Sequence, residues 1–364
     1  MYPTLALYIN GEFIEAQQRK TEPVINPATQ ETLGHLPHAS QADLDFALES
    51  AQTAFESWRH SSPMERSEIL RKVAQLCRDN AQEIGRNITL DQGKPLTESV
   101  AEVINCSEHA EWHAEECRRI YGRIIPPRNP AVRQMVVREP IGVCVAFTPW
   151  NFPFNQAIRK ITAAIGAGCT IIIKGPEDAP SAVLAIAEMF HKAGLPKGVL
   201  NVVWGVPAEV SDYLIRSPIV RKVSFTGSVP VGKQLAALAG AHMKPVTMEL
   251  GGHSPVLVFP DVDIPRVAKQ LAYFKVRNAG QVCISPTRFY IHEDIYQPFK
   301  DEFITILDGI KVGNGLESET EMGPLAHERR LGVMDRFVED AVNRGAKIAL
   351  GGKSLSDTGF FYAP

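Results

Sequence analysis

The sequence lacks the features that mark membrane, secreted and nucleic-acid-binding proteins. Its longest apolar runs, such as residues 141–147, fall far short of the ~18 residues that a membrane-spanning helix needs. The formal net charge is only −3, so no basic excess favours binding to nucleic acid or to an anionic membrane. The N-terminus has no cationic stretch followed by a long apolar core, and we therefore expect no secretory signal.

None of the six cysteines belongs to a CxxC pair, which argues against a disulfide framework. Five of them lie in apolar or helical surroundings: Cys77, Cys106, Cys117, Cys144 and Cys169. Such cysteines suit a reducing compartment, so the sequence predicts a cytoplasmic protein. The sixth, Cys283, lies in the polar stretch "VRNAGQVCISPTR", where a thiol could pack, bind a metal, form a disulfide or attack a substrate.

The N-terminal part of the chain reads as helices followed by a projecting arm. Residues 40–59 carry apolar side chains at helical spacing, with Ser40 as the N-cap. A second helix is predicted to start at Ser62, with Pro63 at its first position. The stretch 122–142 is rich in proline and flanked by alternating segments, which predicts an exposed hairpin.

From residue 141 to residue 259, short β-branched runs alternate with helical segments. The predicted strands are "IGVCVAF", "CTIIIK", "VLNVV", "RKVSFT" and "SPVLVF". The helices between them are predicted to start near four residues: Phe154, Ser181, Pro207 and Val231. This alternation is typical of an α/β fold with a doubly wound parallel sheet, and the patterns after Gly251 predict a second α/β domain.

Two segments that follow predicted strands carry residues suited to a nucleotide. In "VSFTGSVPVGKQLA", Gly227 and Gly232 stand where a strand meets a helix, so backbone amides there could bind a pyrophosphate. A plain strand-to-helix turn fits this segment as well. In "IIIKGPEDAP", Lys174 and Glu177 follow another strand, at the edge where parallel sheets bind ligands. They could hold ribose hydroxyls or form a solvated surface pair.

Two further polar side chains are candidates for chemistry on a carbonyl group. Glu249 follows Met248, and we expect its carboxylate to be buried in apolar company, which suits a general base. The alternative is a structural carboxylate held by backbone amides. Asn151, in "FTPWNFPFNQAIRK", lies between prolines, so its amide could be an oxyanion donor or part of an aromatic corner. His253 has no partner at ligand spacing and is a poor metal candidate.

Cys283 stands out because of the residues around it. Its neighbours are glycine and polar groups, and Arg277 and Arg288 could favour the thiolate. A cysteine is more often part of the core than a nucleophile. However, a thiol, a carboxylate, a rigid amide donor and a nucleotide-type turn are together the parts of cofactor-dependent acyl chemistry. We therefore predict that this thiol is a nucleophile.

The motifs "PWNFP", "FTGSxxxG", "MELGGHSP" and "NAGQVC" occur in this order along the chain. Their order and spacing resemble those of the NAD(P)-dependent aldehyde dehydrogenases, and the resemblance covers essentially the whole chain. It implies three catalytic residues: Cys283 as nucleophile, Glu249 as general base and Asn151 in the oxyanion hole. It implies six cofactor contacts and no metal: Trp150, Lys174, Glu177, Gly227, Ser228 and Gly232.

The same resemblance implies a reaction and a domain organisation. The Cys283 thiolate adds to an aldehyde, hydride leaves to the nicotinamide, and Glu249 activates the water that hydrolyses the thioester. NAD is expected rather than NADP, because the carboxylate of Glu177 repels a 2′-phosphate. The implied parts are a Rossmann-like cofactor domain (1–121 and 143–249), the oligomerisation hairpin of a homodimer or homotetramer (122–142) and a catalytic domain (250–364).

Two arginines suggest the substrate. Arg277 precedes Cys283 on the segment that the resemblance places along the aldehyde tunnel, and Gln156 and Arg159 share one face of a helix. The sequence most resembles the 2-ketoglutarate-semialdehyde and succinate-semialdehyde members, in which arginines at these places hold a distal carboxylate. We expect succinic, glutaric or 2-ketoglutaric semialdehyde as substrate. The alternative is that both arginines make internal salt bridges.

The chain also departs from the family pattern. The resemblance implies a glutamate–x–phenylalanine–glycine–proline motif, a longer catalytic domain and a C-terminal strand that joins the oligomeric sheet, and this sequence carries none of them. The catalytic domain is therefore expected to be incomplete. The rival interpretation is a non-catalytic relative that folds or binds nucleotide without turnover. A CoA-acylating enzyme is a third interpretation, which Glu249 disfavours because a water-activating base serves hydrolysis.

Overall fold

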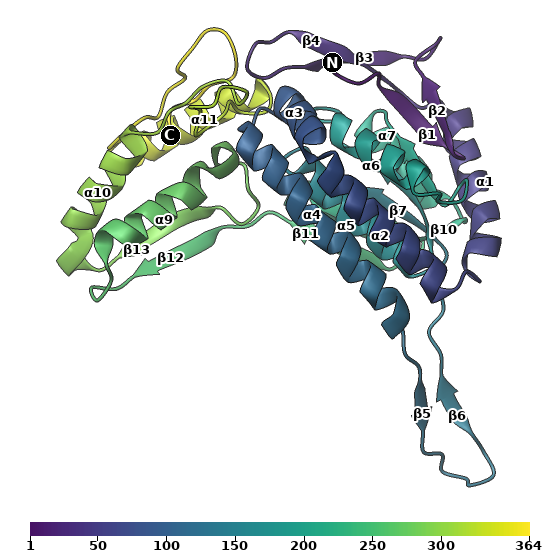
Figure 1. Ribbon diagram of the computed structural model, residues 1–364. Coiled ribbons are helices and arrows are strands. Elements are labelled where there is room, and N and C mark those ends of the chain that lie inside the picture. The colour runs from purple at the N-terminus through teal and green to yellow at the C-terminus, as the bar shows by residue number, and fades with distance from the viewer.

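A seven-stranded sheet forms the centre of the molecule in the computed structural model, which describes residues 1–364 (Figure 1). The strand order is β11-β10-β7-β8-β9-β1-β2. Five strands run parallel: β7 (Val143–Phe147), β8 (Thr170–Lys174), β9 (Leu200–Val203), β10 (Val220–Gly227) and β11 (Val246–Leu250). Two short strands extend the β9 edge in antiparallel fashion: β1 (Ala6–Ile9) and β2 (Glu12–Glu15).

Helices cover both faces of the sheet, which is why its strands are runs of apolar residues. Every residue of β7, β8 and β9 is buried. One face is covered by α5 (Pro153–Gly166) and α6 (Ser181–Lys192). The other is covered by α1 (Gln41–Trp58), α7 (Pro207–Arg216) and α8 (Val229–Ala241). The predicted doubly wound α/β fold is confirmed.

The direction of the crossovers reverses between β7 and β10. These strands are neighbours, paired through Phe147 and Phe225, but the chain leaves β7 toward β8 and leaves β10 toward β11. At such a switch point the following loops diverge and leave a crevice at the carboxyl edge of the sheet. Trp150 and Asn151 follow β7, and Gly227 ends β10, so the fold places all three at this crevice.

The N-terminal helices begin where the sequence predicted. Ser40 forms a capping box with Asp43 at the start of α1. The Ser62 side chain accepts a hydrogen bond from the Glu65 backbone N–H, and Pro63 is the first residue of α2. Three helices form an outer layer over α5 and α6: α2 (Pro63–Asp79), α3 (Ala81–Gln92) and α4 (Leu96–Glu116). A separate hairpin precedes α1 and consists of β3 (Thr21–Ile25) and β4 (Thr32–Pro37).

An antiparallel hairpin of β5 (Arg123–Ile125) and β6 (Gln134–Val136) projects from the body as an arm (Figure 1). It occupies the stretch 122–142, as predicted. All of its strand residues are exposed, including Ile124 and Met135. Apolar side chains on an isolated two-stranded arm favour contact with another chain.

A second, two-stranded parallel sheet consists of β12 (Ser254–Val258) and β13 (Pro286–Ile291), which α9 (Ile264–Val276) connects. The expectation that "SPVLVF" belongs to the central sheet is wrong. That run forms β12, whereas β11 takes the place beside β10 in the central sheet. The physical reason is the pair of glycines, 251–252, after which the chain leaves the central sheet.

The C-terminal part of the chain returns to the N-terminal half. α10 (Tyr296–Asp308) packs against α9, and the chain then runs back before α11 (Arg329–Asn343). Along this path the Leu96 N–H donates to the carbonyl oxygen of Gly315. No helix has the length and apolar character needed to span a lipid bilayer.

Candidate active site

A cleft of about 1820 Å³ lies at the crevice where the crossovers reverse. It is bounded by the loops after β7, β10 and β11 and by the loop before β13. Nine of the twelve predicted site residues line it: Trp150, Asn151, Gln156, Arg159, Gly227, Ser228, Glu249, Arg277 and Cys283. The other three are not part of its lining: Lys174, Glu177 and Gly232.

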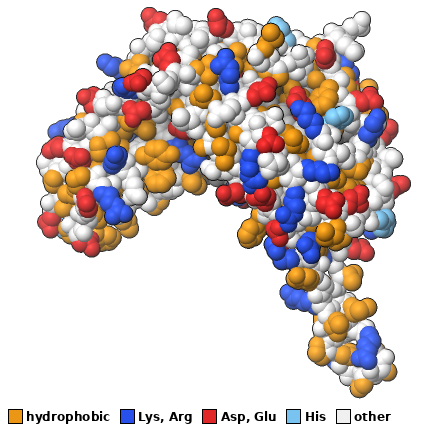
Figure 2. Space-filling view, viewed as in Figure 1, with side chains coloured by type: hydrophobic (Ala, Val, Ile, Leu, Met, Phe, Trp, Pro, Cys, Tyr) orange, Lys and Arg blue, Asp and Glu red, His pale blue; other side chains and the backbone are white.

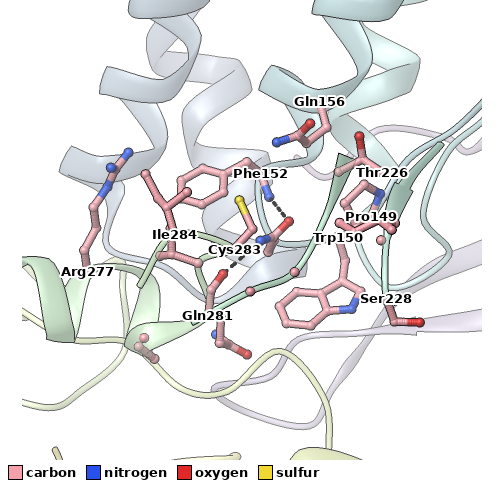
Figure 3. Close-up of a pocket in the computed structure, with 18 of the residues that line it drawn as sticks. Pro149, Trp150, Phe152, Gln156, Thr226, Ser228, Arg277, Gln281, Cys283 and Ile284 are labelled. Atoms are coloured by element: carbon pink, nitrogen blue, oxygen red, sulfur yellow. Dashed lines mark hydrogen bonds between the residues drawn. The ribbon is translucent and has the colours of Figure 1, made fainter. Parts of the chain in front are cut away.

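Cys283 is the one exposed cysteine of the six, and the five cysteines in apolar or helical surroundings are buried. It lies in a short loop between the 3₁₀ turn at residues 277–280 and β13. In Figure 3 the thiol lies between Phe152 and Ile284 on one side and Trp150 and Ser228 on the other. Arg288, which was expected to favour the thiolate, lies in β13 outside the cleft lining.

Asn151 is held rigidly beside this loop. Its amide nitrogen donates to the carbonyl oxygen of Gln281 at 2.9 Å, and its amide oxygen accepts from the Phe152 N–H at 3.1 Å. An amide nitrogen carries two hydrogens, so one N–H remains for a ligand in the cleft. The predicted oxyanion donor therefore has a fixed orientation and a free donor.

A buried ion pair between Lys94 and Glu102 fixes the backbone of Asn151. The Lys94 ammonium donates to a carboxylate oxygen of Glu102 and to the Asn151 carbonyl oxygen, both at 2.7 Å. The other Glu102 oxygen accepts from the N–H groups of Phe154 and Asn155 at the start of α5. Because the N-cap position of α5 makes no side-chain bond, Glu102 supplies its cap from a distant helix.

Asn278 links the loop of the thiol to the same network. This side chain is 1% exposed, donates to the Asn151 carbonyl oxygen at 2.7 Å and accepts from the Gln92 amide at 2.8 Å. Its own N–H donates to Glu98. Asn278 and the following Ala279 adopt left-handed backbone conformations, with φ of 49° and 52°. A β-carbon disfavours this region, so the surrounding hydrogen bonds must hold the turn in place.

Glu249 is exposed, and the expectation that it is buried in apolar company is wrong. β11 is the edge strand of the sheet, so apolar neighbours in sequence do not enclose its side chains. Glu249 instead lines the cleft near Lys160, whose amino group donates to the Ser224 hydroxyl at 2.9 Å. Burial lowers the pKa of Lys160 to about 8, and the Glu249 carboxylate partly offsets this shift.

Arg159 and Arg277 reach the cleft from different elements, α5 and the turn before Cys283. Neither makes a salt bridge within 4.0 Å, which argues against the alternative of internal pairing. The Arg277 guanidinium lies 5.1 Å from the centre of the Phe152 ring. Gln156 also lines the cleft, one helical turn from Arg159, as its spacing predicted.

The opposite end of the cleft is formed by Trp150 and the start of α8. The Trp150 ring stacks edge to face on the His327 ring at 5.2 Å. Ser228, the N-cap of α8, is exposed and its side chain makes no capping bond, so the first amides of α8 are open to a ligand. A β-carbon at Gly232 would lie 2.5 Å from Leu250, so this glycine lets α8 approach β11.

Lys174 forms an ion pair with the half-buried Glu177 at the end of β8, so the solvated surface pair is wrong for Lys174, which is 5% exposed. Burial lowers the pKa of Lys174 and raises the pKa of Glu177, and their mutual attraction opposes both shifts. Neither residue is part of the cleft lining, although β8 is the neighbour of β7 in the sheet.

Comparison with known proteins decides the family. The model of the aldehyde dehydrogenase family matches residues 13–364. The chain belongs to the aldehyde dehydrogenase family. The resemblance seen in the motifs is therefore confirmed, and the protein is an oxidoreductase that acts on aldehydes. Aldehyde dehydrogenases use NAD or NADP as hydride acceptor.

Several relatives are closely similar. The chain is 43% identical to a putative 4-(hydroxymethyl)benzenesulfonate dehydrogenase of Comamonas testosteroni, over 100% of this chain and 76% of the relative. It is 40% identical to the glutarate-semialdehyde dehydrogenase of Pseudomonas putida, over 98% of this chain and 74% of the relative. The crystal structure of succinate-semialdehyde dehydrogenase from Burkholderia pseudomallei superimposes with a TM-score of 0.96 at 39% identity, covering 99% and 75% of the two chains.

Sequence reasoning missed the residues that support the site from beneath. They are Lys94, Glu98, Glu102, Asn278, Gln281 and His327. A signal was present for two of them, because Asn278 and Gln281 belong to the "NAGQVC" motif. Nothing in the sequence pairs Lys94 with Glu102 or with the loop after β7, since these contacts join separate elements.

Proposed function

We propose that this aldehyde dehydrogenase oxidises short aldehydes that carry a carboxylate at their far end, through a thioester on Cys283. The observation that carries the proposal is that two unpaired guanidinium groups, Arg159 and Arg277, line the same cleft as the exposed thiol. Succinic, glutaric and 2-ketoglutaric semialdehyde are the proposed substrates. Relatives named for glutarate semialdehyde and succinate semialdehyde support this class.

The first half of the reaction is addition to the carbonyl group. The sulfur of Cys283 bonds to the aldehyde carbon, and the carbonyl oxygen becomes an oxyanion. The free N–H of Asn151 and the backbone N–H of Cys283 donate to this oxygen as its charge develops. A nicotinamide cofactor bound in the cleft would supply the acceptor for the hydride that leaves the former aldehyde carbon. The carbonyl then re-forms as a thioester.

The second half is hydrolysis of the thioester. Glu249 accepts a proton from a water molecule, whose oxygen attacks the thioester carbon, and the Cys283 thiolate leaves. Exposure of Glu249 in the cleft gives water access to this carboxylate. The amino group of Lys160 lies near this carboxylate, which raises the pKa of the lysine and partly offsets the effect of burial. The products are the dicarboxylate and the free thiolate.

The residues around the cleft fit a dinucleotide. The open amides at the start of α8, next to Gly227 and Ser228, would hold the pyrophosphate. Trp150 would lie along the nicotinamide half of the cofactor. Glu177 lies outside the cleft lining and pairs with Lys174 at the end of β8. Its carboxylate would favour NAD there, because it would accept bonds from ribose hydroxyls and repel a 2′-phosphate. In the variant Glu177→Ser, the ratio of kcat/KM for NADP to that for NAD should rise. A wild-type preference for NADP would contradict this part of the proposal.

The protein is also proposed to form a homo-oligomer in the cytoplasm. The exposed apolar residues of the arm support a homodimer or homotetramer in which the hairpin contacts another subunit. The five buried, unpaired cysteines support a cytoplasmic location.

The proposed substrate class is tested by removing the two arginines one at a time. Initial rates of NADH formation are measured with succinic and glutaric semialdehyde and with butanal, for wild type, Arg159→Ala and Arg277→Ala. Each variant should raise KM for the semialdehydes by ~10-fold or more, the loss expected for a charge-assisted pair, and barely change KM for butanal. Arg288→Ala, which removes an arginine outside the cleft lining, is the matched control.

Two outcomes would contradict the proposal. A wild-type enzyme that prefers butanal would show that the arginines do not hold a carboxylate. So would variants whose KM rises equally for the semialdehydes and for butanal. Absence of NADH formation with every aldehyde, together with intact nucleotide binding, would instead favour the non-catalytic interpretation of the chain.

A further inference from the structure

A second cavity, of about 840 Å³, lies at the neck where the arm joins the body. Residues from the end of α1, the start of α2, the 3₁₀ turn that follows α4 and the bases of both arm strands line it. Figure 1 shows where the arm joins the body. Six arginines and a single carboxylate, that of Glu139, belong to this lining: Arg59, Arg66, Arg118, Arg119, Arg123 and Arg138. Figure 2 shows basic side chains where the arm leaves the body.

Most of this positive charge has no counter-charge in the protein. Arg59 lies 3.9 Å from Glu139, and Arg119 pairs with two glutamates at the end of α4. The remaining four form no salt bridge: Arg66, Arg118, Arg123 and Arg138. The chain as a whole has a net charge of −3, so the cluster does not reflect a generally basic surface.

Arg66 is the least expected member of the cluster. It is 6% exposed, and its Nε has no hydrogen-bond partner. Its polar neighbour is the thiol of Cys117, whose pKa is raised by burial and partly lowered by this guanidinium. Arginine is almost never buried unless it is paired, because an uncompensated cation in the interior costs free energy. The side chain lines the cavity, so an anion there would supply the missing partner.

The guanidinium of Arg66 packs closely against the backbone of Gly168. A β-carbon at Gly168 would lie 2.7 Å from one terminal nitrogen of the guanidinium, and Gly168 has a left-handed backbone with φ of 80°. The glycine thus leaves the space that the guanidinium occupies. A larger residue at position 168 would therefore displace the guanidinium from the cavity wall.

We propose that this neck cavity binds a small multivalent oxyanion, with Arg66 as its buried anchor and Arg123 and Arg138 as contacts from the arm. The guanidinium fork suits phosphate and carboxylate oxygens in bidentate geometry. The volume lies within the range of small-molecule pockets, roughly 300–1,000 Å³. The shared chemistry is an anion with several oxygens, carried by a phosphate or by a compound with several carboxylates. The site is separate from the cleft of Cys283, whose arginines are Arg159 and Arg277.

The test is calorimetric titration of the protein, without aldehyde or cofactor, with inorganic phosphate and with citrate. Sodium chloride keeps the ionic strength constant, so that general screening does not contribute. Wild type should bind one of the two anions saturably, and the tighter of the two identifies the phosphate or polycarboxylate class. The double variant Arg123→Gln/Arg138→Gln should weaken this binding ~10-fold or more.

The control variant is Arg128→Gln/Arg133→Gln. It removes the same charge from the same arm, at positions outside the cavity lining, and should leave the affinity nearly unchanged. Arg66→Lys keeps the buried charge but loses the fork, and should also bind more weakly. If Arg66→Lys fails to fold, the exposed double variant still decides the question.

Three results would overturn the proposal. The first is that neither anion binds saturably to wild type. The second is that the control variant loses as much affinity as the cavity variant, and the third is that Arg123→Gln/Arg138→Gln changes only the oligomer size in light scattering. The last result would mean that the arginines contact a second chain. Because no aldehyde is present, each of these results is independent of the proposed dehydrogenase activity.

Discussion

The side-chain amide of Asn151 donates a hydrogen bond to the carbonyl oxygen of Gln281 at 2.9 Å, and Gln281 lies two residues before Cys283 in the same loop. The bond joins the loop after the first parallel strand to a segment between the two strands of the second sheet. A donor and a nucleophile that are tied in this way keep their relative position, as addition to a carbonyl requires.

Cys283 should be the only cysteine that reacts in the native protein. Iodoacetamide should add one carbamidomethyl group to wild type and none to Cys283→Ala, because the other five thiols are buried. The same variant should lose aldehyde oxidation by several orders of magnitude while it still binds NAD. Intact-mass spectrometry and an NADH assay check the two parts. Residual oxidation above ~1% of wild type would rule out the nucleophile role.

Glu249→Gln should separate the two halves of the reaction. The amide keeps the shape of the side chain but cannot accept a proton, so the thioester should form and then persist. Mass spectrometry of the variant after mixing with aldehyde and NAD should show an acyl adduct on the peptide that contains Cys283. Since Glu249 is exposed, the thermal stability should stay near that of wild type. A normal steady-state rate without an adduct would contradict the assignment.

Asn278→Ala should slow catalysis, although the side chain at this position does not contact the substrate. The change removes the bonds from the Asn278 amide to the Asn151 carbonyl oxygen and from Gln92, and alanine disfavours the left-handed backbone at this position. We expect kcat to fall on the order of 10-fold or more with little change in KM, because the oxyanion donor loses its support. Asn278→Asp, which keeps the size but loses the donor, should behave similarly. A lower melting temperature with unchanged kcat would show a purely structural role.

Stability should depend on pH through Asp91, a carboxyl group with no exposed surface. It accepts hydrogen bonds from the Tyr2 hydroxyl and the Ser181 N–H, and burial raises its pKa to about 7. Between about pH 4 and pH 7 the folded protein keeps a proton that the unfolded chain has lost. The contribution of this group is therefore complete at low pH and disappears as pH rises through about 7.

The measurement is urea unfolding of wild type and Asp91→Asn at pH 5 and at pH 8. From pH 5 to pH 8 wild type should lose roughly 3 kcal/mol of stability relative to the variant, because about two pH units of this interval lie below the folded pKa of about 7. Asparagine keeps the acceptor oxygen but does not titrate, so the difference isolates this carboxyl group. Asp308→Asn, an exposed carboxyl group without a hydrogen-bond partner, should track wild type at both pH values. Parallel curves for all three proteins would contradict the prediction.

The sequence predicted those features that depend on local pattern. The strands of the central sheet, the caps at Ser40 and Ser62 and the projecting hairpin all follow from periodicity and from turn residues. That Trp150 and Gly227 lie at the same crevice follows from one further rule, that parallel sheets bind ligands where the crossovers reverse. Assignment of roles to these residues depended on the motifs.

The features that were missed or wrong depend on distant contacts. Apolar neighbours in sequence suggested that Glu249 is buried, but the position of β11 at the edge of the sheet leaves it open. The assignment of "SPVLVF" to the central sheet failed because strand pattern alone does not say which sheet a strand joins. The Lys94–Glu102 pair and its bond to Asn151 depend on how α4 packs against α5, which no local pattern encodes.

The pairing of β1 with β9 has a consequence for synthesis of the chain. Tyr8 pairs with Val202, so the N-terminal strand has no neighbour on its β9 side until residue 202 has left the ribosome. During this time Leu5, Leu7 and Ile9, which are buried in the finished protein, remain open to wrong partners. We expect nascent chains that stop before residue 200 to need a chaperone, and longer ones to become protease-resistant at their N-terminus once β9 has emerged.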